Sequence, residues 1–161
     1  TKKLMAAGKW KLYDLAKKYL ADGTHDLDDT TNWRIALFLS TSNANTLSVG
    51  TAVYGDLTNE HANANGYTTG GLPLLSETWT NSAGTITFDA GDVVWTATGG
   101  PITARYAVIY KNATVNTIVK PLLCVCVLDT APADVTATAG NTLTITMNAS
   151  GLFTLSGGNV D

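Results

Sequence analysis

The chain has 161 residues, of which 45% are hydrophobic and 14% are charged, and its formal net charge is −3. This length fits a single domain, 1–161, that is long enough to bury a core of its own. No apolar run approaches the ~20 residues that a membrane-spanning helix needs, which excludes a transmembrane helix. A charged fraction this low suits a protein whose surface is covered by neighbouring proteins, although an ordinary stable β-domain has the same composition.

The net charge hides an asymmetry between the start of the chain and the rest. Six of the ten basic residues fall in the first eighteen positions, namely Lys2, Lys3, Lys9, Lys11, Lys17 and Lys18. The remainder is acidic and has no basic residues interleaved with aromatic ones, so we expect neither nucleic-acid nor membrane binding. Docking onto an acidic protein surface fits this pattern better.

Residues 3–21 are predicted to form a helix that ends at Asp22-Gly23. Apolar or small residues recur on one side at helical spacing, at Gly8, Leu12, Leu15, Ala16 and Tyr19. Trp10 lies off this stripe, and Lys9 and Lys17 lie on the charged side. We take these three residues as candidate partner contacts. Lysine and tryptophan also interrupt the apolar positions, so no signal peptide is expected and the protein should stay in the cytoplasm where it is made.

The segment 25–30 reads HDLDDT and is the densest acidic cluster. It lacks the glycine and the distal glutamate of a helix-loop-helix calcium site, so we interpret it as a solvated turn without a metal. Residues 33–40 follow as a strand. Because both of its faces are apolar, this strand should be central in its sheet.

Residues 41–66 are dominated by Ser, Asn, Thr and Gly and are predicted to form a long loop, with one helical turn near 57–61. Long loops in compact domains are usually functional or disordered. In this chain we expect the loop to touch a partner, and Tyr54 and His61 are candidate contacts. Tyr67, in the motif GYTTGG that follows, is another. No lysine follows that motif, so it is not a phosphate loop.

Residues 72–80 are predicted to be a strand with Pro73 near its start. The segment 85–111, TITFDAGDVVWTATGGPITARYAVIYK, contains three alternating runs and is predicted to be a three-stranded antiparallel meander. Arg105 lies on the less apolar face of the third run. We expect it to pair with Asp89, with Asp92 or with an acid of a neighbouring subunit, and it is the last candidate contact.

The C-terminal third continues the β pattern. A strand over 118–128 is interrupted by Pro121, a short edge strand is expected around Val135, and a strand with alternating threonines covers 142–147 before the terminal residues 152–155. The prediction is therefore a mainly β protein, an antiparallel β-sandwich of jelly-roll type over 33–155 with one N-terminal helix. A sheet closed on itself is the alternative.

The reactive side chains point to no enzyme. Cys124 and Cys126 are two positions apart in a strand, which does not suit a disulfide, so we expect buried free thiols. His25 and His61 lie in polar loops without the spacing of a zinc motif, and no nucleophile elbow accompanies them. We therefore expect no catalytic residues, no cofactor and no metal.

The runs FDAGDVVWTA and ITARYAVIYK, with GYTTGG upstream and TITMNASGLFTL near the end, resemble small virion structural proteins of tailed bacteriophages. The likeness covers most of the chain and rests on sheet and turn motifs. It implies a non-enzymatic virion component, expected to be a capsid decoration or cement protein whose partner is the major capsid protein or another virion protein. A homo-oligomer is expected, and a trimer would fit threefold lattice positions.

Two alternatives stay open. One is a structural component of the neck or tail. The other is a glycan-binding module of a tail or fibre, because β-sandwiches with exposed aromatic rings bind sugars by stacking. Trp79, Trp95, Tyr54 and Tyr67 are the rings that would have to be exposed.

Overall fold

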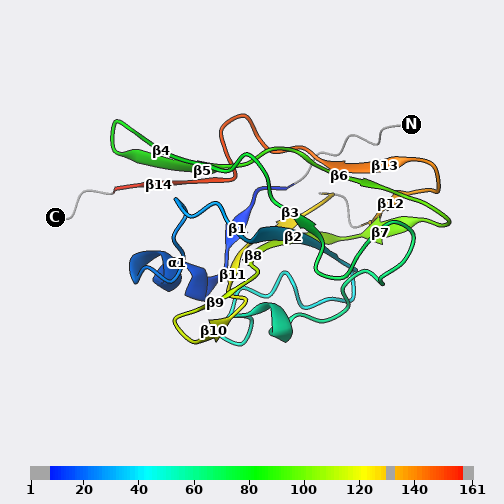
Figure 1. The fold of residues 1–161 in the computed structure, drawn as a ribbon, viewed down its shortest axis with the longest axis horizontal. Coiled ribbons are helices and arrows are strands. Elements are labelled where there is room, and N and C mark those ends of the chain that lie inside the picture. The colour runs from blue at the N-terminus through cyan, green and yellow to red at the C-terminus, as the bar shows by residue number, and fades with distance from the viewer. Residues whose placement is uncertain (1–7, 130–132, 158–161) are drawn as a thin grey trace.

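A computed structural model describes residues 8–129 and 133–157 of the chain. The described part is mainly β, with one short α-helix, and its paired strands are antiparallel (Figure 1). The first elements are β1 (Lys11–Leu12), α1 (Asp14–Ala21), β2 (Trp33–Phe38), the 3-10 helix η1 (Tyr54–Asp56), β3 (Leu72–Pro73), β4 (Thr78–Ser82), β5 (Thr85–Asp89) and β6 (Val93–Thr96). The remaining strands are β7 (Ile102–Ala104), β8 (Tyr106–Lys111), β9 (Thr114–Val115), β10 (Ile118–Val119), β11 (Leu122–Val127), β12 (Val135–Ala137), β13 (Thr142–Ile145) and β14 (Phe153–Ser156).

A five-stranded sheet in the order β1-β11-β8-β2-β3 lies at the centre of the fold. β2 pairs with β8 over its whole length, from Trp33 opposite Lys111 to Phe38 opposite Tyr106. Five of the six residues of β2 are buried, so both faces of the strand are covered. The expectation that this strand is central is confirmed, because a strand that is apolar on both faces loses the least by being enclosed.

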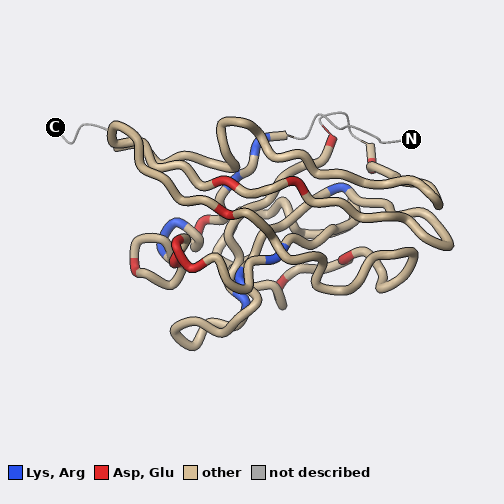
Figure 2. The backbone as a smooth tube through the Cα atoms, turned by 45° about the horizontal axis from the view of Figure 1, so that its top comes forward, with Lys and Arg blue, Asp and Glu red and all other residues tan. Residues whose placement is uncertain are grey.

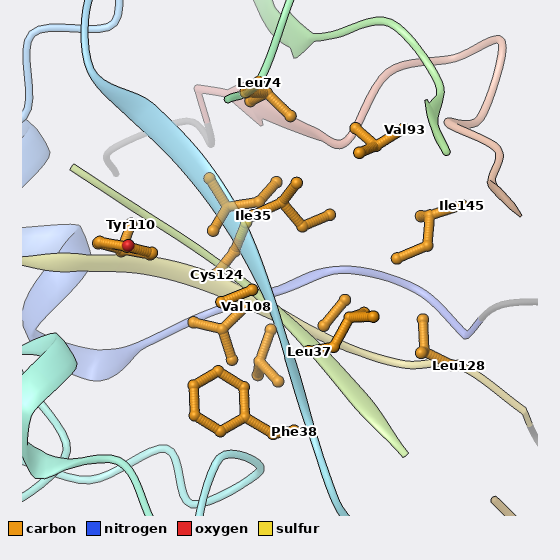
Figure 3. Close-up of a cluster of buried hydrophobic side chains, with 14 of the residues drawn as sticks. Ile35, Leu37, Phe38, Leu74, Val93, Val108, Tyr110, Cys124, Leu128 and Ile145 are labelled. Carbon is orange, nitrogen blue, oxygen red and sulfur yellow. The ribbon is translucent and has the colours of Figure 1, made fainter. Parts of the chain in front are cut away.

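The face of this sheet that is uppermost in Figure 1 packs against the remaining strands, including β6 and β13. Leu74, Val93 and Ile145 approach Ile35 and Leu37 of β2 from that side (Figure 3).

The lower face is covered by the long loop. The Tyr54 ring lies 4.4 Å from Tyr110 and 6.3 Å from Phe38, centroid to centroid. Tyr13 Oη donates to the Ala44 carbonyl 2.5 Å away. The loop predicted over 41–66 is therefore present, and its single helical turn is η1 rather than a turn at 57–61.

The segment 85–111 is β, as predicted, but its third run is divided at Arg105 into β7 and β8, and the strands do not form a meander. β5 pairs with β4 and β14, β6 with β13, β7 with β12, and β8 with β2 and β11. The stretch 89–92 therefore connects two sheets instead of turning a hairpin. Asp92 Oδ1 accepts a hydrogen bond from the Met147 amide at 2.9 Å, which ties this connection to the C-terminal strands. Alternation gives the buried face of a strand, but it does not specify the strand's partner.

The predicted helix over 3–21 is wrong over residues 8–13. Residues 3–7 lie outside the described part, Lys11 and Leu12 form β1 against Val125 and Cys124, and the helix begins only at Asp14. The edge of β11 offers unpaired backbone groups, and the Gly8 amide also donates to the Val127 carbonyl at 2.8 Å. Pairing with β11 gives partners to backbone groups that the first turn of a helix would leave without them.

Two other predicted strands are divided. The strand expected over 72–80 consists of β3 and β4, separated by residues 74–77, and the strand expected over 118–128 is split at Pro121 into β10 and β11. Proline has no N–H for a ladder, and the register also shifts between Leu122 and Cys124, as the interruption suggested. The short strand around Val135 is confirmed as β12.

Candidate functional site

The carboxylate of Glu60 accepts hydrogen bonds from two tyrosines and one backbone amide. Tyr54 Oη donates to Oε2, Tyr67 Oη donates to Oε1 at 2.6 Å, and the Gly70 amide donates to Oε1 at 2.6 Å. Tyr67 Oη also accepts the Leu37 amide of β2 at 3.0 Å. Two tyrosines from the loop and one sheet strand thus meet at a single acid.

Glycines in the motif GYTTGG allow the chain to reach this position. Gly71 has a φ of +69°, and a Cβ there would lie 1.9 Å from the Ile35 carbonyl oxygen. Only glycine fits so close a backbone contact in the left-handed region. The Gly70 carbonyl then accepts hydrogen bonds from Arg34 Nε at 3.0 Å and Tyr110 Oη at 2.9 Å.

The tyrosines of this network are held as neutral donors. Burial, with the Glu60 carboxylate as hydrogen-bond acceptor, raises the pKa of Tyr54 and of Tyr67 well above the ordinary value. Burial raises the pKa of Tyr110 to about 12. The hydrogen bonds of Tyr54 and Tyr67 are stronger than bonds between neutral groups, because their acceptor is the Glu60 carboxylate. The arrangement therefore fixes residues 54–71 on the lower face of the sheet.

A second polar cluster lies where α1 and the acidic turn meet β8. Lys111 is 4% exposed; its Nζ lies 2.7 Å from Asp29 Oδ2 and 4.9 Å from the centroid of the Trp33 ring. The Asp29 carbonyl accepts Trp33 Nε1 at 2.8 Å, and Asp29 Oδ1 accepts the Thr31 amide at 3.0 Å. The acidic segment is therefore a turn, as expected, and one of its carboxylates compensates a buried ammonium.

His25 belongs to the same cluster. Its ring lies 5.3 Å from both Tyr19 and Trp33, and its Nε2 lies 2.8 Å from the Leu122 carbonyl. Nε2 is the donor in this contact because a carbonyl can only accept. Nδ1 is buried and has no hydrogen-bond partner in the described part. The pKa of His25 is lowered to about 4, mainly by burial and to a smaller degree by the nearby Lys111.

The seven candidate partner contacts differ in how far their side chains are exposed. Lys9 and Lys17 are exposed, and Trp10, Tyr54 and Arg105 are half-buried. His61 and Tyr67 are 7% and 2% exposed, so their side chains are occupied inside the chain. The structure brings Tyr54 and Tyr67 together at Glu60, with His61 against Tyr67. Lys9 lies before α1 and Lys17 lies on it.

The predicted partners of Arg105 have contacts of their own. Asp89 Oδ1 accepts the Ala90 amide at 2.8 Å, and Asp92 Oδ1 accepts the Met147 amide. Arg105 Nη1 donates to the Ala133 carbonyl. A carboxylate of another subunit stays a prediction for this guanidinium.

Cys124 and Cys126 are buried free thiols, as expected. Burial raises the pKa of Cys126 to about 12 and that of Cys124 well above its ordinary value. Within 8–129 and 133–157, no three His, Cys, Asp or Glu side chains are grouped so that they could hold a metal ion.

The sheet β14-β5-β4 forms one end of the molecule, at the upper left of Figure 1. From the pairing register, one of its faces carries Thr78, Thr80, Ser82, Thr85, Thr87, Asp89, Thr154 and Ser156. The other face carries Trp79, Asn81, Ile86, Phe88, Phe153 and Leu155. Phe88 is fully buried, whereas Trp79, Ile86 and Leu155 are half-buried. The sheet thus presents hydroxyls on one side and a partly uncovered apolar surface on the other.

The aromatic rings that a glycan platform would use are mostly enclosed. Trp95 and Tyr67 are each 2% exposed, and Tyr54 and Trp79 are half-buried. Glu60 was not predicted as a site residue, because one acid in a long polar loop belongs to no pattern. The features of the sequence that could have indicated a fixed position for residues 54–71 are Tyr54, Tyr67 and the two adjacent glycines of GYTTGG.

The search of family models found no match for the chain, and neither did the searches of curated proteins and of solved structures. None of the helices in the described residues has the length and apolar character needed to cross a bilayer.

Proposed function

We propose that the chain is a structural protein of a tailed-bacteriophage particle, and that it decorates the capsid and stabilises the head. The proposal includes the arrangement of its two layers of strands as a jelly-roll sandwich. It rests first on the resemblance of the segments 85–111, 66–71 and 144–155 to small virion proteins. Many residues in those segments are core residues, such as Phe88, Trp95 and Ile145, so the likeness concerns the fold rather than a reaction.

The structural observation that supports the proposal best is the surface of the sheet β14-β5-β4. None of the residues from Thr78 to Phe88 is charged (Figure 2), and the exposed ones are all polar or small, namely Thr78, Thr80, Asn81, Ser82, Ala83 and Gly84. A neighbouring protein can cover such a surface without removing water from unpaired charges, which is the main cost of burying polar surface. A decoration protein gains much of its buried area only when it docks.

The exposed lysines supply the second contact. Lys9 and Lys11 lie before α1 and Lys17 lies on it, all three exposed. An acidic patch on the capsid would attract this end of the chain and orient it during docking. Binding should therefore weaken as salt is raised.

The proposal is tested on particles of the phage that encodes the chain, with and without its coding sequence. Both preparations are heated with a dye that reports released DNA, and the chain is located on intact particles by cryo-electron microscopy. We expect the chain on the head surface and DNA release at a lower temperature from particles that lack it, because a ligand of the assembled shell stabilises it.

Location on the neck, tail tube or fibre would overturn the decoration role while leaving a structural role. Binding of the purified chain to a glycan array, with no chain on the head, would favour the receptor-binding alternative instead. Unchanged heat release from particles that lack a head-bound chain would contradict the stabilising role.

A further inference from the structure

The two larger sheets of this protein differ in how their edges are protected. The five-stranded sheet ends in β1 and β3, which are two residues long and carry Lys11 and Pro73. Short strands, lysine and proline are the usual means of preventing an edge from pairing with another chain. The three-stranded sheet ends in β4, TWTNS, and β14, FTLS, which contain no charge and no proline. Its edges therefore lack the protection that the chain uses elsewhere.

The outward-facing backbone groups of β4 follow from its hairpin. Ala83 and Gly84 have φ of 49° and 80°, the geometry of a two-residue turn with positive φ at both positions. The closing pair of such a turn, Ser82 with Thr85, is hydrogen-bonded, and pairs alternate along the ladder. Trp79 and Asn81 therefore direct their N–H and C=O groups away from β5. In the described part of the chain, β4 pairs with β5 alone.

These outward groups are complementary to a second copy of themselves. In an antiparallel pairing of two β4 strands about a twofold axis at Thr80, Trp79 of each copy faces Asn81 of the other. Each such pair can exchange both backbone hydrogen bonds. The residues at the centre, Thr80 and its symmetry mate, are a favourable cross-strand pair, and no charge of β4 meets a like charge.

We propose that the chain self-associates through β4, so that two three-stranded sheets join into one continuous sheet. The contact also covers Trp79, which is half-buried in the single chain. A contact of this symmetry closes at two copies, which replaces the trimer expected from threefold lattice positions. The pairing requires no phage particle, so it can succeed or fail independently of the decoration role.

The edge at β14 provides a matched control. Thr80 and Thr154 are both exposed, both lie on the hydroxyl face, and both are paired with Thr87 of the central strand. Lysine at either position adds the same charge to the same face. At Thr80 it places two ammonium groups opposite each other on the proposed axis, whereas at Thr154 it lies two strands away from that axis.

The test measures the mass of the purified chain by light scattering and sedimentation over a range of concentrations. We expect about twice 16.9 kDa for the wild type and for Thr154→Lys, and 16.9 kDa for Thr80→Lys at the same concentrations. Hydrogen exchange of the wild type should show the Trp79 and Asn81 amides protected more as concentration rises, and that rise should be lost in Thr80→Lys. Circular dichroism and thermal melting show whether each variant is folded.

A wild type that stays at the monomer mass at ~100 µM, a concentration at which even micromolar contacts form, would overturn the proposal. So would a trimer mass, or a Thr80→Lys variant that remains associated. If Thr154→Lys alone dissociates the assembly, the contact lies at β14 and the assignment to β4 is wrong. If Thr80→Lys does not fold, the concentration dependence of exchange at Trp79 and Asn81 in the wild type decides the question.

Discussion

Lys111 Nζ lies 2.7 Å from Asp29 Oδ2, and the lysine of this ion pair is almost fully buried. The side chain of Asp29 is 42% exposed, so the carboxylate keeps much of its hydration while the ammonium depends on the protein for compensation. An ammonium with little access to water needs a partner, because an unpaired buried charge is costly. The ion pair between Asp29 and Lys111 therefore holds the acidic turn against β8.

This asymmetry predicts that the two partners respond differently to mutation. Asp29→Asn keeps an acceptor for the Thr31 amide but removes the charge opposite Lys111, and should destabilise the fold by about 1–3 kcal/mol. Lys111→Met removes the buried charge together with its need for compensation, and should cost less. Urea unfolding of both variants and of the double variant measures the difference. A larger cost for Lys111→Met would show that the lysine's own contacts outweigh the burial of its charge.

The Glu60 network predicts a local effect of removing one hydroxyl. Tyr67→Phe removes the donor to Glu60 and leaves the Leu37 amide without its acceptor, so we expect a loss of about 1–3 kcal/mol. Hydrogen exchange should also accelerate at Leu37 and across residues 54–71, because the tyrosine joins these segments.

Tyr106→Phe is the control for that variant. Tyr106 is half-buried on β8, and no hydrogen bond of its hydroxyl is described. Its loss should change stability by less than about 0.5 kcal/mol. Equal effects of the two variants on stability and exchange would mean that the network does not fix the loop.

The sequence predicted those features that depend on local patterning. The strand predicted over 33–40 is present as Trp33–Phe38 because both of its faces are apolar, and the short strand around Val135 was also predicted correctly. The partners of β5, β6 and β7 were not found, since alternation says which face is buried and not which strand lies beside it. β1 was missed because its two residues pair only after β11 is in place.

The site was predictable to a smaller degree. Tyr54, His61 and Tyr67 were singled out as unusual in a polar loop, but as contacts for a partner. In the structure they gather around Glu60. Tyr54 lies 6 residues before Glu60 and Tyr67 lies 7 residues after it, and Tyr67 also contacts Leu37 of β2, 30 residues earlier in the chain. A hydrogen-bond network of this kind has no fixed spacing. The exposure of Lys9 and Lys17 follows directly from their charge.

The two thiols should be unreactive in the folded protein. Attack on an alkylating reagent requires the thiolate, and burial both raises the pKa of Cys126 to about 12 and excludes the reagent. Labelling with a thiol reagent should be slow in buffer at neutral pH and should reach two thiols per chain quickly in urea. Rapid native labelling of one cysteine would mean that β1 detaches from β11, and a protected thiol in urea would indicate oxidation.

The close approach at Gly71 predicts a large cost for adding one methyl group. In Gly71→Ala the Cβ would lie 1.9 Å from the Ile35 carbonyl oxygen at a φ of +69°, so the segment must move away from β2. Gly84→Ala is the matched control, because its φ is +80° and nothing lies within 4 Å of the new Cβ. The control should lose only the conformational cost, about 1–2 kcal/mol. Thermal or urea unfolding should show a clearly larger loss for Gly71→Ala, and equal losses would rule out the steric contact.

His25 predicts that stability falls as the solution is acidified. Its pKa is lowered from an ordinary value of 6.5 to about 4 in the folded chain, mainly by burial. As the pH drops below about 6.5, the unfolded chain takes up a proton that the folded chain does not, so the folded state loses stability until about pH 4. The full difference amounts to about 3 kcal/mol at ~1.4 kcal/mol for each pKa unit. Above about pH 6.5 this contribution is fully present.

His25→Gln isolates this effect, because an amide can still donate to the Leu122 carbonyl but does not titrate. The comparison is needed because Glu77 acts in the opposite direction: burial raises its pKa, so the folded chain takes up that proton first and gains stability on acidification. Urea unfolding of both proteins at several values between pH 4 and 7 should show a flatter dependence for the variant. If the two curves are parallel, His25 is not the group responsible. Carboxylates such as Asp29, whose pKa falls from 3.8 to about 2 on folding, lose their stabilising contribution mainly below about pH 4 and so affect this range little.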